Sequence, residues 1–186
     1  GSDSGGGAGI QADLKTFSAL GVYGMSAITA VTVQNTTSVL GVQEMPPDIA
    51  AGQIDAVFSD IRVDAVKIGM QFSAATIVAV AACLRRWRPS FVVLDPVMIS
   101  KSGCALMQPE AGIALQRELL PIASLVTPNI PEAEAITGLR IKSHSDMEKA
   151  AAVIVALGAK AVLLKGGHST GNADDRQAAV AAALEA

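Results

Sequence analysis

Stretches with a helical repeat of apolar residues alternate along the chain with short runs of β-branched and other apolar residues. Residues 8–20 place Ile10, Leu14, Phe17 and Leu20 at the spacing of one helix face. The same reasoning predicts further helices over 46–58, 73–86, 110–119, 131–137, 145–157 and 176–186, with Ser73 as a cap. Strands are predicted over 25–33, 65–68, 91–94, 125–126 and 161–164.

This alternation determines the fold class that we predict. Strands separated by helices of about ten to fifteen residues form βαβ units, which build a parallel sheet. The strands are apolar on both faces, as expected when helices cover both sides of the sheet. The sequence therefore predicts an α/β protein with a mainly parallel central sheet.

Polar residues follow the predicted strands one after another. They are Gln34-Asn35, Gly69-Met70, Asp95, Asn129 with Glu132, and Lys165-Gly166-Gly167-His168. Ligands bind beyond the carboxyl ends of the strands in an open parallel sheet, so this pattern predicts a ligand site. Taken singly, Asp95 and Asn129 are equally consistent with caps of turns beside prolines.

The glycine-rich run over residues 1–9 is the strongest local signal. Glycines allow the backbone to approach a ligand and expose N–H groups at the start of a helix. The run matches neither the P-loop pattern nor the dinucleotide fingerprint. By itself it indicates either a ligand loop or a tight turn.

Several polar residues have both a functional and a structural interpretation. Asp13 either faces a site or favours the helix dipole. Glu132 suits a Mg²⁺ shell through water, or is simply an acid at a helix start. Lys165 beside two glycines offers a phosphate site, or is a surface lysine. Trp87 is interpreted as a packing residue at a helix end with a basic rim.

Composition narrows the functional classes. The chain has 186 residues, is 51% hydrophobic and carries a formal net charge of −3, so intrinsic disorder and nucleic-acid binding are not expected. The uncharged stretches 16–43 and 68–84 contain polar residues and do not predict a membrane span. The two cysteines, Cys83 and Cys104, form neither a disulfide framework nor a metal motif, and they favour a cytoplasmic location.

Six blocks of sequence, taken together, resemble a known family. Residues 1–16 (Gly-Ser-Asp-Ser-Gly-Gly-Gly-Ala-Gly-Ile-Gln-Ala-Asp-Leu-Lys-Thr) are similar to the opening signature of bacterial hydroxymethylpyrimidine/phosphomethylpyrimidine kinases of thiamine biosynthesis. The family's other blocks are resembled by residues 30–36, 67–70, 95–98, 127–134 and 164–168. The resemblance implies one ribokinase-like domain over 1–186, with a three-layer α/β/α fold, ATP and Mg²⁺ as cofactors, and a homodimer.

The resemblance also implies roles for individual residues. Gln34 would bind the aminopyrimidine edge, and Asp13 would lie near the reacting hydroxyl. The slot around the ring would be formed by Gly1, Ala8, Met70 and Val97. Asp95, Asn129 and Glu132 would organise Mg²⁺ and the triphosphate, with Glu132 and Asp95 nearest the metal. The ATP phosphates would meet Lys165, Gly166 and Gly167.

The chain departs from the family in one block. The family carries a late Gly-Thr-Gly-Cys anion hole, which supplies the group nearest the attacking hydroxyl, and this block does not occur here. We expect that residues are omitted before Gly1, where the family has its first strand, and near Asp174-Asp175. Two alternatives stay open: a pyridoxal or pyridoxine kinase, and a non-catalytic pyrimidine-binding module.

Overall fold

The computed structural model describes residues 1–98, 106–166 and 179–183, the last five by their backbone alone. The chain divides into two compact units, which are described one at a time. The N-terminal unit comprises Gly1–Val63, Gly69–Arg88 and Val97–Ala111, and the sheet unit comprises the remaining residues. The single domain predicted over 1–186 stays a prediction. Among the described residues, no helix has the length and apolar character that crossing a membrane requires.

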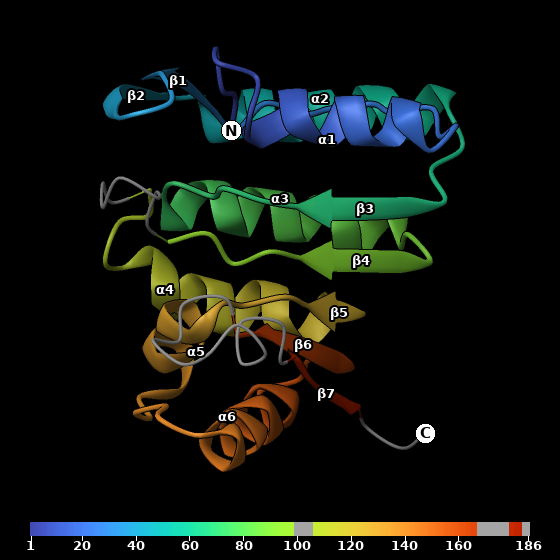
Figure 1. Cartoon of the computed structure of the whole chain (residues 1–186). Helices are drawn as coiled ribbons and strands as arrows, with labels where there is room; N and C mark the ends of the chain where they lie inside the picture. The colour runs from blue at the N-terminus through green and yellow to red at the C-terminus, as the bar shows by residue number, and fades with distance from the viewer. Residues whose placement is uncertain (99–105, 167–178, 184–186) are drawn as a thin grey trace. The chain divides into compact units, whose positions relative to one another are not determined.

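The sheet unit contains a five-stranded sheet that is mainly parallel, as predicted. Its strands are β3 (Ala65–Ile68), β4 (Phe91–Leu94), β5 (Leu125–Val126), β6 (Ala161–Lys165) and β7 (Ala179–Ala183), in that spatial order (Figure 1). The first four run parallel, whereas β7 pairs antiparallel with β6. Leu94, Val126, Val162 and Leu164 have no exposed surface. Such burial explains why these strands read as continuous apolar runs.

Capping residues mark the ends of two of the helices in the sheet unit. The helix predicted over 110–119 is a short α4 (Ala111–Ala114) followed by a π-helical turn (Leu115–Leu119) and a 3-10 turn (Leu120–Ile122). Ser143 caps α6 (His144–Ala156) through its hydroxyl. Gly138, at φ +72°, ends α5 (Ile130–Thr137) in the left-handed conformation that glycine adopts without strain.

The N-terminal unit contains α1 (Gly9–Ala19), α2 (Pro47–Asp60), α3 (Ala74–Trp87) and an antiparallel hairpin, β1 (Ala30–Gln34) with β2 (Val39–Glu44). The prediction for this hairpin was wrong in two respects. The strand predicted over 25–33 begins later and does not join the parallel sheet, and β2 was missed. Gln34 is therefore the last residue of a hairpin strand, and Asn35 follows this strand and not a parallel one.

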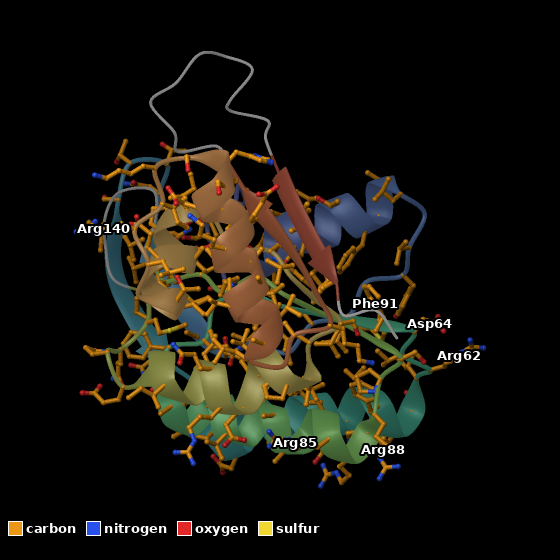
Figure 2. All side chains as sticks on the ribbon, turned by 90° about the horizontal axis from the view of Figure 1, so that it is seen from below. Arg62, Asp64, Arg85, Arg88, Phe91 and Arg140 are labelled. Carbon is orange, nitrogen blue, oxygen red and sulfur yellow. The ribbon has the colours of Figure 1, made fainter. Side chains whose placement is uncertain are left out.

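The contact between α2 and α3 confirms the packing role of Trp87. Its ring stacks on Phe58 with the centroids 5.5 Å apart, and its indole N–H donates to Asp55 at 2.7 Å. Asp55 also pairs with Arg86, and this guanidinium contributes most to holding the pKa of Asp55 below its usual range. Arg85 and Arg88 are exposed beside this contact and form the predicted basic rim (Figure 2).

The prediction for the end of the chain was also wrong. A helix was expected over 176–186 because alanine has the highest helix propensity. Residues 179–183 instead form β7, in register with β6 from Ala161↔Ala183 to Lys165↔Ala179. Pairing with a neighbouring strand overrides the local preference of the alanines. Residues 176–178 and 184–186 lie outside the described residues.

Candidate functional site

The glycine loop before α1 is organised around the carboxylate of Asp3, which is only 5% exposed. This carboxylate accepts hydrogen bonds from three backbone N–H groups at 2.8 to 3.0 Å, those of Gly5, Gly7 and Ala8. The Asp3 N–H in turn donates to the Gln11 side chain at 2.8 Å. The loop is therefore a compact turn that is held together by hydrogen bonds to the Asp3 carboxylate.

Gln34, the residue predicted to bind the substrate ring, is held by this loop. Its backbone carbonyl accepts a hydrogen bond from the Ser4 hydroxyl at 2.9 Å. The Gln34 side chain contributes most to holding the pKa of Asp3 below its usual range. Backbone donors add to this effect, which outweighs the opposing effect of burial.

An apolar cluster in the same unit contains two of the predicted slot residues. Met70 is buried with Ala30 and Leu106, and Val97 packs against this cluster. Gly1 also lies close to Met70, because a Cβ added at Gly1 would come within 2.7 Å of the Met70 sulfur. Gly1, Met70 and Val97 thus belong to one region, and their role around the ring stays a prediction.

The other two residues predicted for the substrate side lie on or beside α1. Ala8 is exposed at the N-cap position of α1, and its N–H is one of the three that Asp3 binds. Asp13 is half-buried on α1 itself. Their roles at the ring and at the reacting hydroxyl stay predictions.

The close approach of two backbone segments explains why residue 9 is a glycine. Gly9 has φ +56°, and a Cβ at this position would lie 2.6 Å from the Gly1 carbonyl oxygen. The first turn of α1 therefore packs directly on the chain at Gly1 and Ser2, which only a glycine permits.

In the sheet unit, three polar side chains meet at the carboxyl ends of adjacent strands. Asp95 follows β4, and its Oδ1 lies 3.0 Å from the Nζ of Lys165, the last residue of β6. The Thr127 hydroxyl, which follows β5, donates to the same Asp95 oxygen at 3.3 Å. The parallel register produces this meeting, since Thr127 N–H also binds the Leu94 carbonyl.

Asn129 and Glu132 form a capping box at the start of α5. The Asn129 side chain accepts from the Glu132 N–H at 2.9 Å, and Glu132 Oε2 accepts from the Asn129 N–H at 2.8 Å. Glu132 is only 6% exposed. These two residues therefore stabilise the helix start, whatever else they do.

The backbone ties this helix start to Lys165. Residues Asn129 and Lys165 form a parallel bridge, and Lys165 N–H donates to the Pro128 carbonyl at 2.8 Å. Gly166 is buried directly after Lys165. Gly167 and His168 lie outside the described residues, as does Cys104. Asp95, Asn129, Glu132, Lys165 and Gly166 thus share one edge of the sheet unit.

The donors at this edge suit a magnesium ion that retains water. They are a half-buried carboxylate, a hydroxyl, an amide and a buried carboxylate, and all of them offer the oxygen ligands that Mg²⁺ prefers. Within the described ranges, no group of three or more His, Cys, Asp or Glu side chains could hold a metal by itself. A carboxylate or two plus substrate phosphates is the usual Mg²⁺ arrangement, so the residues fit.

Two residues of these sites were missed by the sequence analysis. Thr127 could have been found, because it follows a strand in the same way as Asp95. Asp3 had a weaker signal: an aspartate two residues before a run of glycines is well placed to accept the backbone N–H groups of its own turn.

These features can be compared with those of known protein families. The sequence model of the phosphomethylpyrimidine kinase family matches residues 3–183, nearly the whole chain.

The chain belongs to the phosphomethylpyrimidine kinase family.

Similar proteins and structures agree with this membership. A thiamine biosynthesis bifunctional protein of Geobacter sulfurreducens is 58% identical over 90% of this chain and 34% of its own length. The hydroxymethylpyrimidine/phosphomethylpyrimidine kinase of Rhizobium meliloti is 56% identical over 92% of this chain and 64% of its own. The crystal structure of the phosphomethylpyrimidine kinase of Clostridium difficile is 50% identical, with a TM-score of 0.91, and covers 100% of this chain and 79% of its own.

These neighbours confirm the ribokinase-like α/β fold class that the resemblance implied. Solved pyridoxal kinases also match, at 36 to 40% identity. The chain spans less than two thirds of the length of these two curated relatives, 34% of the Geobacter sulfurreducens protein and 64% of the Rhizobium meliloti kinase.

Proposed function

We propose that the protein is an ATP-dependent phosphotransferase of thiamine biosynthesis. It phosphorylates the hydroxymethyl group of 4-amino-5-hydroxymethyl-2-methylpyrimidine and then converts the monophosphate to the diphosphate. The observation that carries the proposal is the meeting of Lys165 with Asp95, 3.0 Å apart, at the carboxyl ends of parallel strands. A cation and a carboxylate side by side suit a nucleotide phosphate with its metal ion.

Phosphoryl transfer requires little covalent work from the protein, because positioning and charge neutralisation lower most of the barrier. Lys165 binds the phosphates of ATP, and the buried Gly166 lets the chain run close beside them. Asp95, Glu132 and Asn129 hold the bound Mg²⁺, directly or through water. This ion supplies charge neutralisation on the phosphate oxygens.

The N-terminal unit supplies the pyrimidine site in this proposal. Met70, Val97 and Gly1 form an apolar slot for the ring, and Ala8 lies at its glycine loop. Gln34 binds the aminopyrimidine edge, since a side-chain amide presents a donor beside an acceptor. Asp13 orients the reacting hydroxyl.

We also propose that the protein acts as a homodimer in the cytoplasm. The family resemblance supports the dimer, and the sparse cysteines support the reducing compartment. Sedimentation of the full-length protein at two concentrations tests the first point. A single species of monomer mass would contradict it.

The function is tested by a coupled ADP-release assay on full-length protein with Mg-ATP. The hydroxymethylpyrimidine, its monophosphate and pyridoxal are offered in parallel. Turnover on both pyrimidines is expected. Turnover on pyridoxal alone would make the protein a pyridoxal kinase, and pyrimidine binding without turnover would make it a binding module.

A further inference from the structure

We propose that Lys15 binds the phosphate of the monophosphate in the second of the two proposed steps, so that one pyrimidine site accepts both acceptors. This inference rests on the proposed function, because it takes the monophosphate as the second substrate. The two acceptors differ in one group, a neutral hydroxyl in the first step and a phosphate of about two negative charges in the second. The second acceptor therefore needs a cation that the first does not.

The side chain of Lys15 lies over the glycine loop that precedes α1. Lys15 belongs to the second turn of this helix, and its Nζ donates to the Gly6 carbonyl at 2.8 Å. Gly6 has φ +75°, and a Cβ at this position would come within 2.6 Å of the same Nζ. The lack of a side chain at residue 6 therefore leaves the space that the ammonium group occupies.

The same loop borders the predicted pyrimidine site. At the start of the loop, a Cβ added at Gly1 would come within 2.7 Å of the Met70 sulfur. In its middle, the Ser4 hydroxyl donates to the Gln34 carbonyl at 2.9 Å. Ser4 stands only two positions before the carbonyl that Lys15 binds. The ammonium group of Lys15 thus lies on the loop that contacts both the apolar slot and the strand that carries Gln34.

The charge of Lys15 is available to a ligand. Among the described residues, Lys15 forms no ion pair, and the Gly6 carbonyl is its one hydrogen-bond partner. The carboxylate of the loop, that of Asp3, is only 5% exposed and is bound by three backbone N–H groups. An ammonium group has three donors, so two remain for a phosphate. The flexible stem of a lysine also lets the group return to the carbonyl when the acceptor is neutral.

The other basic residues described in the N-terminal unit lie far from the slot. Both α2 and α3 begin near it: Ser73, the cap of α3, follows Met70 by three residues. Met45, just before α2, donates its N–H to the Thr29 carbonyl, and the Thr29 hydroxyl donates to the Met70 carbonyl at 2.9 Å. Each helix has 14 residues and is therefore about 20 Å long. The arginines of this unit lie in or just after the last turns of these helices: Arg62, Arg85, Arg86 and Arg88.

Calorimetry on full-length protein tests the inference by comparing the two acceptors. Wild type and Lys15→Met are titrated with 4-amino-5-hydroxymethyl-2-methylpyrimidine and with its monophosphate. Methionine keeps an unbranched apolar stem and removes the charge. We expect Lys15→Met to weaken binding of the monophosphate by about 10- to 100-fold, because a hydrogen bond between charged groups is lost. Binding of the alcohol should stay within about twofold of wild type. An equal loss for both acceptors, or no loss for the monophosphate, would overturn the inference.

Two matched variants control for the loss of charge. Lys15→Arg keeps a cation that binds phosphate and should recover most of the affinity for the monophosphate. Lys160→Met removes the same charge from an exposed position in the sheet unit and should leave both affinities within about twofold of wild type. If Lys160→Met weakened the monophosphate as much as Lys15→Met does, the effect would come from net charge and the inference would be wrong.

The dependence on salt is a second measurement, which a merely structural role would not change. The affinity of wild type for the monophosphate should fall as the KCl concentration rises, because salt screens exposed charges, whereas the affinity for the neutral alcohol should stay constant. Lys15→Met should make the dependence for the monophosphate less steep. An equally steep dependence in Lys15→Met would contradict the inference. If this variant did not fold, an affinity of wild type for the monophosphate that is independent of salt would do so.

Failure of the inference can be distinguished from failure of the proposed function. ADP release is recorded with both acceptors for wild type and Lys15→Met. If wild type turns over both pyrimidines and Lys15→Met has an unchanged KM for the monophosphate, only the role of Lys15 is wrong. If wild type neither binds nor turns over the alcohol, the proposed function is wrong and the inference falls with it. We expect Lys15→Met to keep the first step and to raise the KM of the second by about 10- to 100-fold.

Discussion

Lys165 illustrates at the scale of one residue how position in the fold distinguishes similar side chains. Lys160 and Lys165 lie at opposite ends of β6, and both are exposed. Only Lys165 lies at the carboxyl end, next to Asp95. Ligands of parallel sheets bind at that end, so the same charge has different consequences at the two positions.

The first prediction follows from this difference. Lys165→Ala should lower kcat/KM for ATP by about 10²-fold, the usual loss when one stabilising group is removed from a transferring phosphate. Lys160→Ala, the matched control, should stay within about twofold of wild type because an exposed charge away from the site does little. Steady-state kinetics of the full-length variants measure both. Equal effects of the two substitutions would remove Lys165 from the nucleotide site.

Single residues also show how far the sequence alone could lead. Asp95, Asn129 and Lys165 were predicted to share one sheet edge because each follows a strand, and parallel strands end on the same side. The hydrogen bond from the Ser4 hydroxyl to the Gln34 carbonyl was not predictable in this way. It joins a loop to a hairpin strand that lies far along the chain. The periodicity of apolar residues in the sequence does not indicate such a contact.

At the scale of elements, the parallel strands were predicted and the hairpin was not. Strands covered on both faces are continuous apolar runs, whereas β2 mixes exposed and half-buried residues around Gly41. The last strand failed for a different reason. The four alanines around Val180 prefer a helix locally, and only the pairing with β6 makes this segment a strand.

The start of α5 provides the second prediction. Glu132 caps the helix and is proposed to bind Mg²⁺, and different substitutions distinguish these two roles. Glu132→Gln keeps a side-chain acceptor for the Asn129 N–H and should leave the melting temperature nearly unchanged. It removes the charge, however, and should raise the Mg²⁺ concentration needed for half-maximal activity. Glu132→Ala loses both roles and should also cost about 1 kcal/mol of stability, or about 2–4 °C. If Glu132→Gln had wild-type Mg²⁺ dependence, Glu132 would be a capping residue alone.

The third prediction concerns the start of α6 and its response to pH. The Ser143 hydroxyl, the Lys142 N–H and Lys149 lower the pKa of Asp146 from its ordinary 3.8. A lowered folded-state pKa gives a stabilisation that is present above the unfolded value and is lost as the pH falls through the folded value. Asp146→Asn should therefore melt at a lower temperature near neutral pH and lose less stability in acid than wild type.

Thermal denaturation of wild type and variant between pH 7 and pH 2 measures this difference. Asp60→Asn is the control, because it removes the same charge from an exposed position at the end of α2. It shows how much of any change comes from the loss of one negative charge alone. Parallel curves for wild type and Asp146→Asn at every pH would show that Asp146 adds no pH-dependent stability.

At the scale of the whole molecule, the two sets of site residues belong to different units of the chain, and this permits a test by ligand-induced stability. A ligand that binds only the folded state stabilises it by about 2.7 kcal/mol at a hundredfold excess over its Kd, or about 5–10 °C. The hydroxymethylpyrimidine and Mg-AMP-PCP should each raise the melting temperature of full-length protein by about this amount.

Gln34→Ala should abolish the shift caused by the pyrimidine and keep that caused by the nucleotide, because only the ring loses its polar partner. Lys165→Ala should do the reverse, and Lys160→Ala should keep both shifts. If Gln34→Ala retained the full pyrimidine shift, the ring would bind elsewhere, whereas loss of both shifts in either variant would mean that the two sites do not bind their ligands independently.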